Sequence, residues 1–384
     1  MVYRSTFALA SVLAFFAPGC AGHIQVEVLE PAAVTMPPDI KTLGIIDRSA
    51  PSGVGEAVLG AIEGLLTGEA ILGDREAAAK AMEELTATLA RSPRFDAVLP
   101  AVTKEQVESD IWDSNLSWKA ADRICKKAGC DALVSLEAID SDSSLEFTQD
   151  VVKESQNGQT VNRIVYVAQR DSSILTAWRV YDVKNHVILD ELRDHRYANT
   201  WEERGDTKEA ALNALPNQVA SLETLGATAG DEYARRIAPS YRWVSRSYYG
   251  RSDDRLKEGK NHVKAQDWDG ASEIWLKLAE HESDPKIRGK AYFDLALWRE
   301  TLGDLDGAHE YAKKAAVDLS NGRSRRYVET LSQRIADQRL LAEQMKVEEE
   351  KNKVKPEKTP SERAEGSPSE RGEPSGESPS ERVH

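Results

Sequence analysis

The stretch WKAADRICKKAGCDALVSLEAID, residues 118–140, joins a helix signal directly to a strand signal. Residues 118–128 are typical of a helix, and Gly129 is the residue type that most often ends a helix in the left-handed conformation. Residues 131–140 are mostly apolar and of strand type. A helix that leads at once into an apolar strand predicts a domain in which helices pack on a sheet.

The residues before this stretch repeat the alternation of strands and helices. Residues 24–34 predict a leading strand or an extended arm, and residues 41–47 a short apolar strand. Asp74 is a plausible N-cap for a helix whose apolar residues fall on one stripe. Residues 95–99 predict another strand.

The residues after the stretch predict an antiparallel meander. Four β-like runs follow one another, at residues 145–154, 161–170, 174–182 and 186–197. Asn157-Gly158 separates the first two, and both residue types tolerate the positive φ of a tight hairpin turn. A helix around residues 207–237 closes the domain, and Pro216 is expected to divide it in two. The elements together predict an α+β protein with a mixed-sheet α/β sandwich domain at residues 41–250.

Several segments resemble the α/β domain of known envelope proteins. TLGIIDRSA, RSPRFDAVLP, AGCDALVSLEAID and TAWRVYDVKNHVILD follow the order found in the N-terminal domain of the Tol translocation protein, the curli-export lipoprotein and lipoprotein activators of cell-wall synthases. EVLEPAAVTMPPDIKTLGIIDRSAP, IEGLLTGEAILGDREAA and IAPSYRWVSRSYYG are similar to an uncharacterised family of bacterial lipoproteins. The resemblance implies this α/β domain followed by helical repeats, without an established activity.

A repeated phrase predicts the helical module. AQDWDGASEIWLKLAE at residues 265–280 is echoed 37 residues later by LGDLDGAHEYAKKAAV at residues 302–317. This offset is close to the tetratricopeptide period of about 34 residues. We therefore expect an all-α tetratricopeptide-like module at residues 251–348, closed by an amphipathic capping helix at residues 323–346. In such repeats the first helix of each pair lines a concave surface that binds a peptide or a helix of a partner. The predicted concave residues are Lys260, Lys264, Lys290, Phe293, Leu297 and Glu300.

Two other interpretations of this surface remain open. Phe293 and Leu297 are equally consistent with packing against the α/β domain, because apolar helix residues usually serve a core. The three lysines could meet an acidic partner or form an ordinary solvated face.

The chain begins with a leader that predicts lipidation of Cys20. Arg4 precedes an apolar stretch at residues 5–17 that is shorter than the roughly 20 residues of a membrane-spanning helix. The following Ala-Pro-Gly-Cys resembles a lipobox, although Pro18 departs from its usual pattern. This predicts a signal peptide at residues 1–19 and a lipidated arm at residues 20–40, with the protein at the outer membrane and facing the periplasm. The alternative is ordinary cleavage after Ala21, which would release a soluble protein.

Two cysteines remain besides Cys20. Cys125 and Cys130 are compatible with a disulfide in an oxidising compartment and equally with two buried thiols. Residues 349–384 are rich in Pro, Ser and Glu, with PSER at three places, and predict a disordered tail.

Composition and motifs argue against nucleic-acid binding and against known catalytic sites. The formal net charge of −14 repels phosphate backbones. The sequence contains no HExxH, GxSxG, P-loop or GxGxxG, so we expect no metal and no cofactor. The predicted function is a non-enzymatic envelope lipoprotein that binds an envelope protein or peptide through its helical repeats. Two alternatives are an assembly or regulatory factor for wall-synthesis or export machinery and an unrecognised periplasmic hydrolase.

Overall fold

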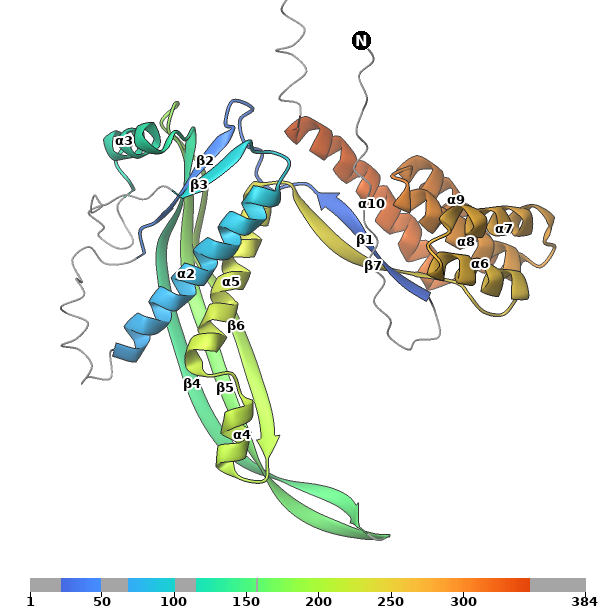
Figure 1. Cartoon of the computed structure of the whole chain (residues 1–384), viewed down its shortest axis with the longest axis horizontal. Helices are drawn as coiled ribbons and strands as arrows, with labels where there is room; N and C mark the ends of the chain where they lie inside the picture. Colours follow the sequence, from blue (N-terminus) through green and yellow to red (C-terminus); the bar gives the residue numbers. More distant parts are fainter. Residues whose placement is uncertain (1–21, 50–67, 101–114, 157, 346–384) are drawn as a thin grey trace, which may run out of the picture. The chain divides into compact units, whose positions relative to one another are not determined.

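The computed structural model describes residues 22–49, 68–100, 115–156 and 158–345. Within them the protein has a mixed α+β structure, in which a region built on a mixed β-sheet is followed by a region of several helices (Figure 1). No helix among these described residues is both long and apolar enough to cross a bilayer.

The main sheet has five strands in the order β3-β2-β4-β5-β6. The short strand β2 pairs in parallel with β3 on one side and with β4 on the other, whereas β4, β5 and β6 form an antiparallel meander. The strands span Thr42–Asp47 (β2), Ala97–Pro100 (β3), Ala132–Gln156 (β4), Gln159–Asp182 (β5) and Val187–Gly205 (β6).

Two long helices, α2 (Gly68–Arg91) and α5 (Gln218–Ile237), lie side by side on one face of this sheet (Figure 1). Their backbones approach very closely, since a Cβ atom on Gly230 would lie 2.0 Å from the carbonyl oxygen of Ala81. Small residues at this contact therefore let the pair cover the sheet as one layer. The short helix α4 (Lys208–Ala214) precedes α5, and Pro216 lies in the break between them, as expected.

On the opposite face, α3 (Trp118–Ala128) covers the end of the sheet where β4 begins and β5 ends. Ser117 caps its first turn, and Gly129 ends it with a φ of 79°, as the sequence predicts. Ile124 of the helix packs with Tyr181 of β5 in the same apolar cluster.

The strands of the meander are longer than the predicted runs. The polar residues 141–144 and 171–173, at which breaks are predicted, lie inside β4 and β5, and residues 142–144 pair with residues 171–173 in an unbroken register. The hydroxyl oxygens of Ser143 and Ser172 are 2.9 Å apart across the two strands. Polar side chains that satisfy one another across a ladder do not end a strand.

A second, two-stranded sheet joins the beginning of the described chain to the end of the α/β region. β1 (Gly22–Glu30) pairs antiparallel with β7 (Ser240–Tyr248). Ile24, Val26 and Val28 of β1 share one apolar cluster with residues of the helical region. This β1–β7 ribbon is therefore packed on the helices, and it is separate from the five-stranded sheet.

The helical region contains two antiparallel helix pairs and a longer final helix. Asp267 and Asp304 are the N-caps of the second helix of each pair, and each accepts a hydrogen bond of 2.9 Å from the backbone N–H of the glycine three residues later. The two DxDGA phrases thus make the same turn twice. The helices span Asp254–Lys264 (α6), Trp268–His281 (α7), Pro285–Thr301 (α8), Leu305–Leu319 (α9) and Gly322–Gln344 (α10).

Candidate functional site

A buried network of charged side chains lies where the parallel strands end. The register of β4 shifts between Leu136 and Ala138, so Glu137 is the extra residue of a β-bulge. Arg48 follows the last residue of β2, and its backbone N–H donates to the carbonyl oxygen of Leu136. β2 lies between two parallel neighbours, with α2 and α3 on opposite faces. Such switch points are where open α/β sheets usually place their ligands.

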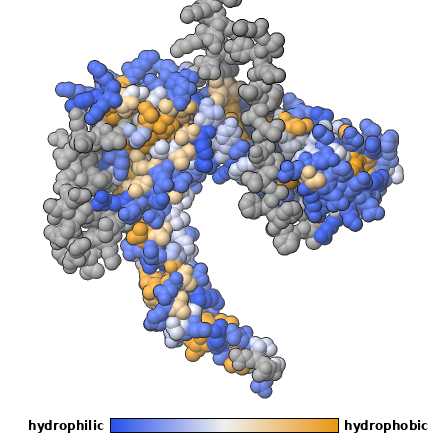
Figure 2. Space-filling model, in the orientation of Figure 1, coloured by the Kyte–Doolittle hydropathy of each residue, from blue (hydrophilic) through white to orange (hydrophobic). Residues whose placement is uncertain are grey.

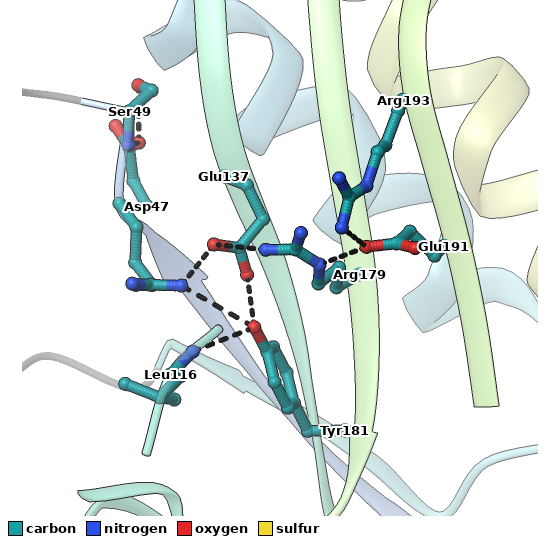
Figure 3. A network of polar contacts seen from close by, with 9 residues as sticks. Asp47, Ser49, Leu116, Glu137, Arg179, Tyr181, Glu191 and Arg193 are labelled. Carbon is teal, nitrogen blue, oxygen red and sulfur yellow. Dashed lines mark hydrogen bonds and ion pairs between the residues drawn. The ribbon is translucent and has the colours of Figure 1, made fainter. Parts of the chain in front are cut away.

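Glu137 is the centre of this network (Figure 3). One carboxylate oxygen accepts hydrogen bonds or ion pairs from Arg48 and, at 3.4 Å, from Arg179 of β5. The other accepts a hydrogen bond of 2.7 Å from the hydroxyl of Tyr181, which in turn accepts one of 3.1 Å from the backbone N–H of Leu116. All of these contacts lie in the interior, with Arg48, Glu137 and Arg179 buried.

The network continues outward through β6. Arg179 also donates to Glu191, which accepts a second ion pair of 2.7 Å from Arg193. The hydrogen bond from Arg193 is the main reason why the pKa of Glu191 lies below its usual value. Charged side chains at the end of β2 and on β4, β5 and β6 are therefore linked in one network.

The electrostatics of the network favour a structural clamp over acid–base chemistry. Burial and the neighbouring Glu137 carboxylate raise the pKa of Tyr181 to about 12, so its phenol stays protonated at neutral pH. Glu137 faces the guanidinium groups of Arg48 and Arg179 and the hydroxyl of Tyr181. These contacts give the sheet a fixed polar centre.

These residues were not predicted from the sequence, although it carries a signal for them. Glu137 is the one charged residue in LVSLEAI, and Arg179 interrupts the apolar run AWRVY. A charge within an apolar strand is costly to bury unless a partner of opposite charge is nearby. The pairing could not be deduced, because it depends on a bulge that the sequence does not reveal.

The predicted cysteine sites have different outcomes. Cys20 lies outside the described residues. Cys125, near the end of α3, and Cys130, just before β4, are joined by a disulfide. Of the two alternatives left open by the sequence, the structure therefore contains the bridge.

The residues predicted for the concave surface are not brought together on one open face. Phe293, Leu297 and Glu300 of α8 are buried, which corrects their assignment to a partner surface. The physical reason is that the β1–β7 ribbon and α10 occupy this side of α8. The Phe293 ring lies 4.8 Å from that of Tyr327 in α10, and Arg246 of β7 forms an ion pair of 3.0 Å with Glu300. The alternative of packing against the α/β domain is correct at its C-terminal end: the Phe293 ring lies 5.3 Å from that of Tyr249, and Leu297 shares an apolar cluster with Tyr248 of β7. Neither cluster includes a residue of the five-stranded sheet.

The three predicted lysines remain accessible to different degrees. Lys290 is half-buried and donates a hydrogen bond of 2.6 Å to Ser252. Lys260 and Lys264 of α6 line an open hollow of about 650 Å³ together with Lys257. The remaining lining residues are Gly250, Arg251, Ser252, Asp253, Asp254 and Asn261.

The hollow carries more positive than negative charge, in a chain whose formal net charge is −14. Its lysines follow one another at intervals of three and four residues, which places them on one face of α6. Asp253, one of its two acidic residues, is engaged by Arg255 and caps the helix. The free charge of this surface is thus mainly basic.

Glu137→Gln tests the clamp. The substitution keeps the shape of the side chain but removes the buried negative charge that faces Arg48 and Arg179. We expect the free energy of unfolding, measured by chemical denaturation, to fall by about 3–5 kcal/mol. Glu146→Gln on the exposed part of β4 is the control and should change it by less than about 0.5 kcal/mol. Equal effects of the two substitutions would contradict a clamp at Glu137.

Tyr181→Phe tests the raised pKa of this phenol through the pH dependence of stability. An unfolded tyrosine ionises near pH 10, whereas Tyr181 in the folded protein ionises near pH 12. The folded state therefore binds more protons between these values, and the stability due to this group is present below pH 10 and lost as pH rises toward 12. The wild type should lose stability more steeply over this range than Tyr181→Phe. Tyr241→Phe, at an exposed position, should keep the wild-type slope, and identical slopes for all three proteins would refute the assignment.

Two parts of the chain match known protein families. Residues 40–249 match a family described as a domain of unknown function (DUF8603), and residues 257–333 match a second one, also described as a domain of unknown function (DUF6340). No curated protein matches the chain. The first match spans the five-stranded sheet, its helices and β7, and it covers more than half of the 384 residues. The chain therefore belongs to the family defined by the domain of unknown function DUF8603.

Proposed function

We propose that this protein is a non-enzymatic lipoprotein of the bacterial envelope that binds an acidic segment of another envelope protein through its helical region. The single observation that carries the proposal is the lysine-lined hollow on α6. A basic surface on an acidic protein attracts partners of opposite charge while the rest of the surface repels them.

The helix pairs support a tetratricopeptide-like interpretation of this region. Gly259 of α6 lies against the buried Trp275 of α7, where a Cβ atom would come within 2.4 Å of the indole nitrogen. Asp267 and Asp304 cap equivalent helices 37 residues apart. Repeats of paired helices commonly present extended surfaces to peptides. Here the ribbon fills the side of α8 that such proteins leave open, whereas the hollow on α6 is accessible.

The lipid anchor of this proposal follows from the leader and its lipobox-like cysteine. Cys20 precedes Gly22, the first residue of β1, by two positions in the sequence. Because the ribbon packs on the helices, a lipid on Cys20 holds the helical region close to the membrane surface. Several acyl chains on one cysteine give nearly permanent attachment, at about 0.8 kcal/mol for each buried CH₂.

Cys20→Ser tests the anchor. Metabolic labelling with a radioactive fatty acid should label the wild-type protein, and the label should be lost in the variant because serine offers no thiol. The variant should also leave the membrane fraction. Cys125→Ser is the control and should keep the label. Equal labelling of wild type and Cys20→Ser would sink the lipid proposal, whatever the helical region binds.

Charge reversal of the hollow tests the partner surface. The triple variant Lys257→Glu, Lys260→Glu, Lys264→Glu should lose most of the envelope proteins that the wild type retains in a quantitative pull-down from envelope extracts. The matched control is Lys277→Glu, Lys286→Glu, Arg325→Glu, which changes the net charge equally at exposed positions of other helices. The control should retain the wild-type set. If all three proteins retained the same set, the hollow would not be the binding surface.

A further inference from the structure

The five-stranded sheet has a long open edge along β4. β2 pairs with β4 only as far as Leu136, and in the rest of the described chain no strand pairs with this side of β4 from Ala138 to Gln156. On its other side β4 is paired with β5 along its whole length. An edge strand offers unpaired backbone N–H and C=O groups, which can form a ladder with an added strand. Figure 1 shows the hairpin of β4 and β5 extending beyond α4.

The two faces of this edge differ in chemistry. The register from Ala138 onward is continuous, so successive side chains of β4 alternate between the faces. The face toward the helices carries Leu145, Phe147 and Val151, which are 36%, 38% and 56% exposed. Hydrophobic patches along this part of the surface are visible in Figure 2. The acidic residues of the edge all lie on the opposite face, and they are Asp140, Asp142, Glu146, Asp150 and Glu154.

Ion pairs within the sheet compensate only part of this acidic row. Arg204 of β6 contacts Asp150 at 3.3 Å, and Arg163 of β5 contacts Glu154 at 2.8 Å. Asp140, Asp142 and Glu146 are exposed and lie along the stretch closer to the body of the sheet. The open edge therefore combines apolar side chains on one face with an excess of negative charge on the other.

We propose that the edge of β4 from Ala138 to Glu154 binds an extended segment of a partner protein in which basic residues alternate with apolar ones. In a strand added to this edge, successive side chains point to alternate faces of the sheet, as they do in β4. Its apolar side chains lie beside Leu145, Phe147 and Val151, and its lysines or arginines lie beside the acidic row. Backbone hydrogen bonds give the affinity, and the two faces select the sequence. This surface is on a different element from the lysine hollow, and the inference does not depend on that hollow.

A second copy of the chain is the less suitable occupant. An antiparallel pair of two β4 edges in register places even-numbered residues opposite even-numbered residues, for example Asp140 opposite Glu154. Like charges directly opposite each other are destabilising. The acidic row therefore opposes self-pairing and favours a basic strand.

The probe for this inference is the synthetic peptide Lys-Val-Lys-Thr-Lys-Val-Lys-Thr-Lys-Val, added to the full-length protein. Its control has the same composition in blocks, Lys-Lys-Lys-Lys-Lys-Val-Thr-Val-Thr-Val, and therefore the same charge without the alternation. We expect the blocked peptide to bind about tenfold more weakly in fluorescence anisotropy. Hydrogen–deuterium exchange should show that the alternating peptide slows exchange in residues 138–154 and leaves α2 unchanged.

Protein variants locate the site. Asp140→Lys, Asp142→Lys, Glu146→Lys should weaken binding of the alternating peptide by about tenfold or more. Glu76→Lys, Glu209→Lys, Glu232→Lys makes the same change in net charge at exposed positions of α2, α4 and α5, and it should bind as the wild type does. Far-UV circular dichroism checks that both variants fold, and the exchange experiment on the wild type decides the question if either does not.

Three results would overturn the inference. The blocked peptide could bind as tightly as the alternating one, which would indicate attraction by charge alone. The amides protected by the peptide could lie outside β4. Finally, a dimer in sedimentation analysis whose β4 amides are protected without peptide would show that a second copy occupies the edge. None of these outcomes would affect the test of the lysine hollow.

Discussion

The antiparallel pairing of β1 with β7 is the constraint on which the arrangement of this chain depends. It joins Gly22 to Tyr248, so that the whole α/β region is a loop between the two strands of one ribbon. The ribbon is a long-range pairing and not a local hairpin, because more than two hundred residues separate its two strands in the sequence. Closing so long a loop costs conformational entropy, which apolar packing of β1 on the helices helps to offset.

The ribbon also decides which surfaces of the helical region remain open. Arg246 of β7, with Arg334 and Tyr327 of α10, surrounds the carboxylate of Glu300. Burial alone would raise the pKa of Glu300, but the hydrogen bond and charge of Arg246, together with the charge of Arg334, hold it below its usual value. One turn and a half earlier in α8, Asp294 is buried with a hydrogen bond from the backbone N–H of Tyr249, and burial raises its pKa well above normal. Asp294 and Glu300 show that the neighbouring charged groups, more than the extent of burial, determine whether a buried carboxylate stays charged.

Local signals in the sequence predicted many elements where a few neighbouring residues determine them, although Asp74, the expected N-cap of α2, lies inside that helix. Gly129 ends α3, Pro216 separates α4 from α5, and the DxDGA phrases begin equivalent helices, because each depends on backbone preferences or capping within one turn. The strand breaks predicted at the serine-rich runs were wrong, since the hydroxyls of Ser143 and Ser172 satisfy each other across the ladder. That partner lies in another strand and is invisible to local pattern.

The candidate site was less predictable for the same reason. Glu137 meets Arg48 and Arg179 only because a bulge in β4 turns it toward them, and the burial of Phe293, Leu297 and Glu300 depends on the β1–β7 ribbon. Local patterns predicted the order of helices and strands, but neither they nor the family resemblance could assign these side chains. Lys260 and Lys264 were predicted from the repeat to line a concave surface, and they line the hollow on α6 together with Lys257, which was not predicted.

The far ends of β4 and β5 extend beyond the rest of the sheet. β6 pairs with β5 only as far as Tyr166, so the residues beyond that point form a two-stranded ribbon. Such a ribbon is marginally stable in water, and exposed ion pairs such as Arg163 with Glu154 contribute only about 0–1 kcal/mol each. Val151 and Ile164 face each other near its end and are 56% and 58% exposed, so this apolar pair is incompletely covered. A third strand along β4 would complete the ladder and cover apolar surface at once, which gives the open edge a physical reason to bind a strand that the closed parts of the sheet lack.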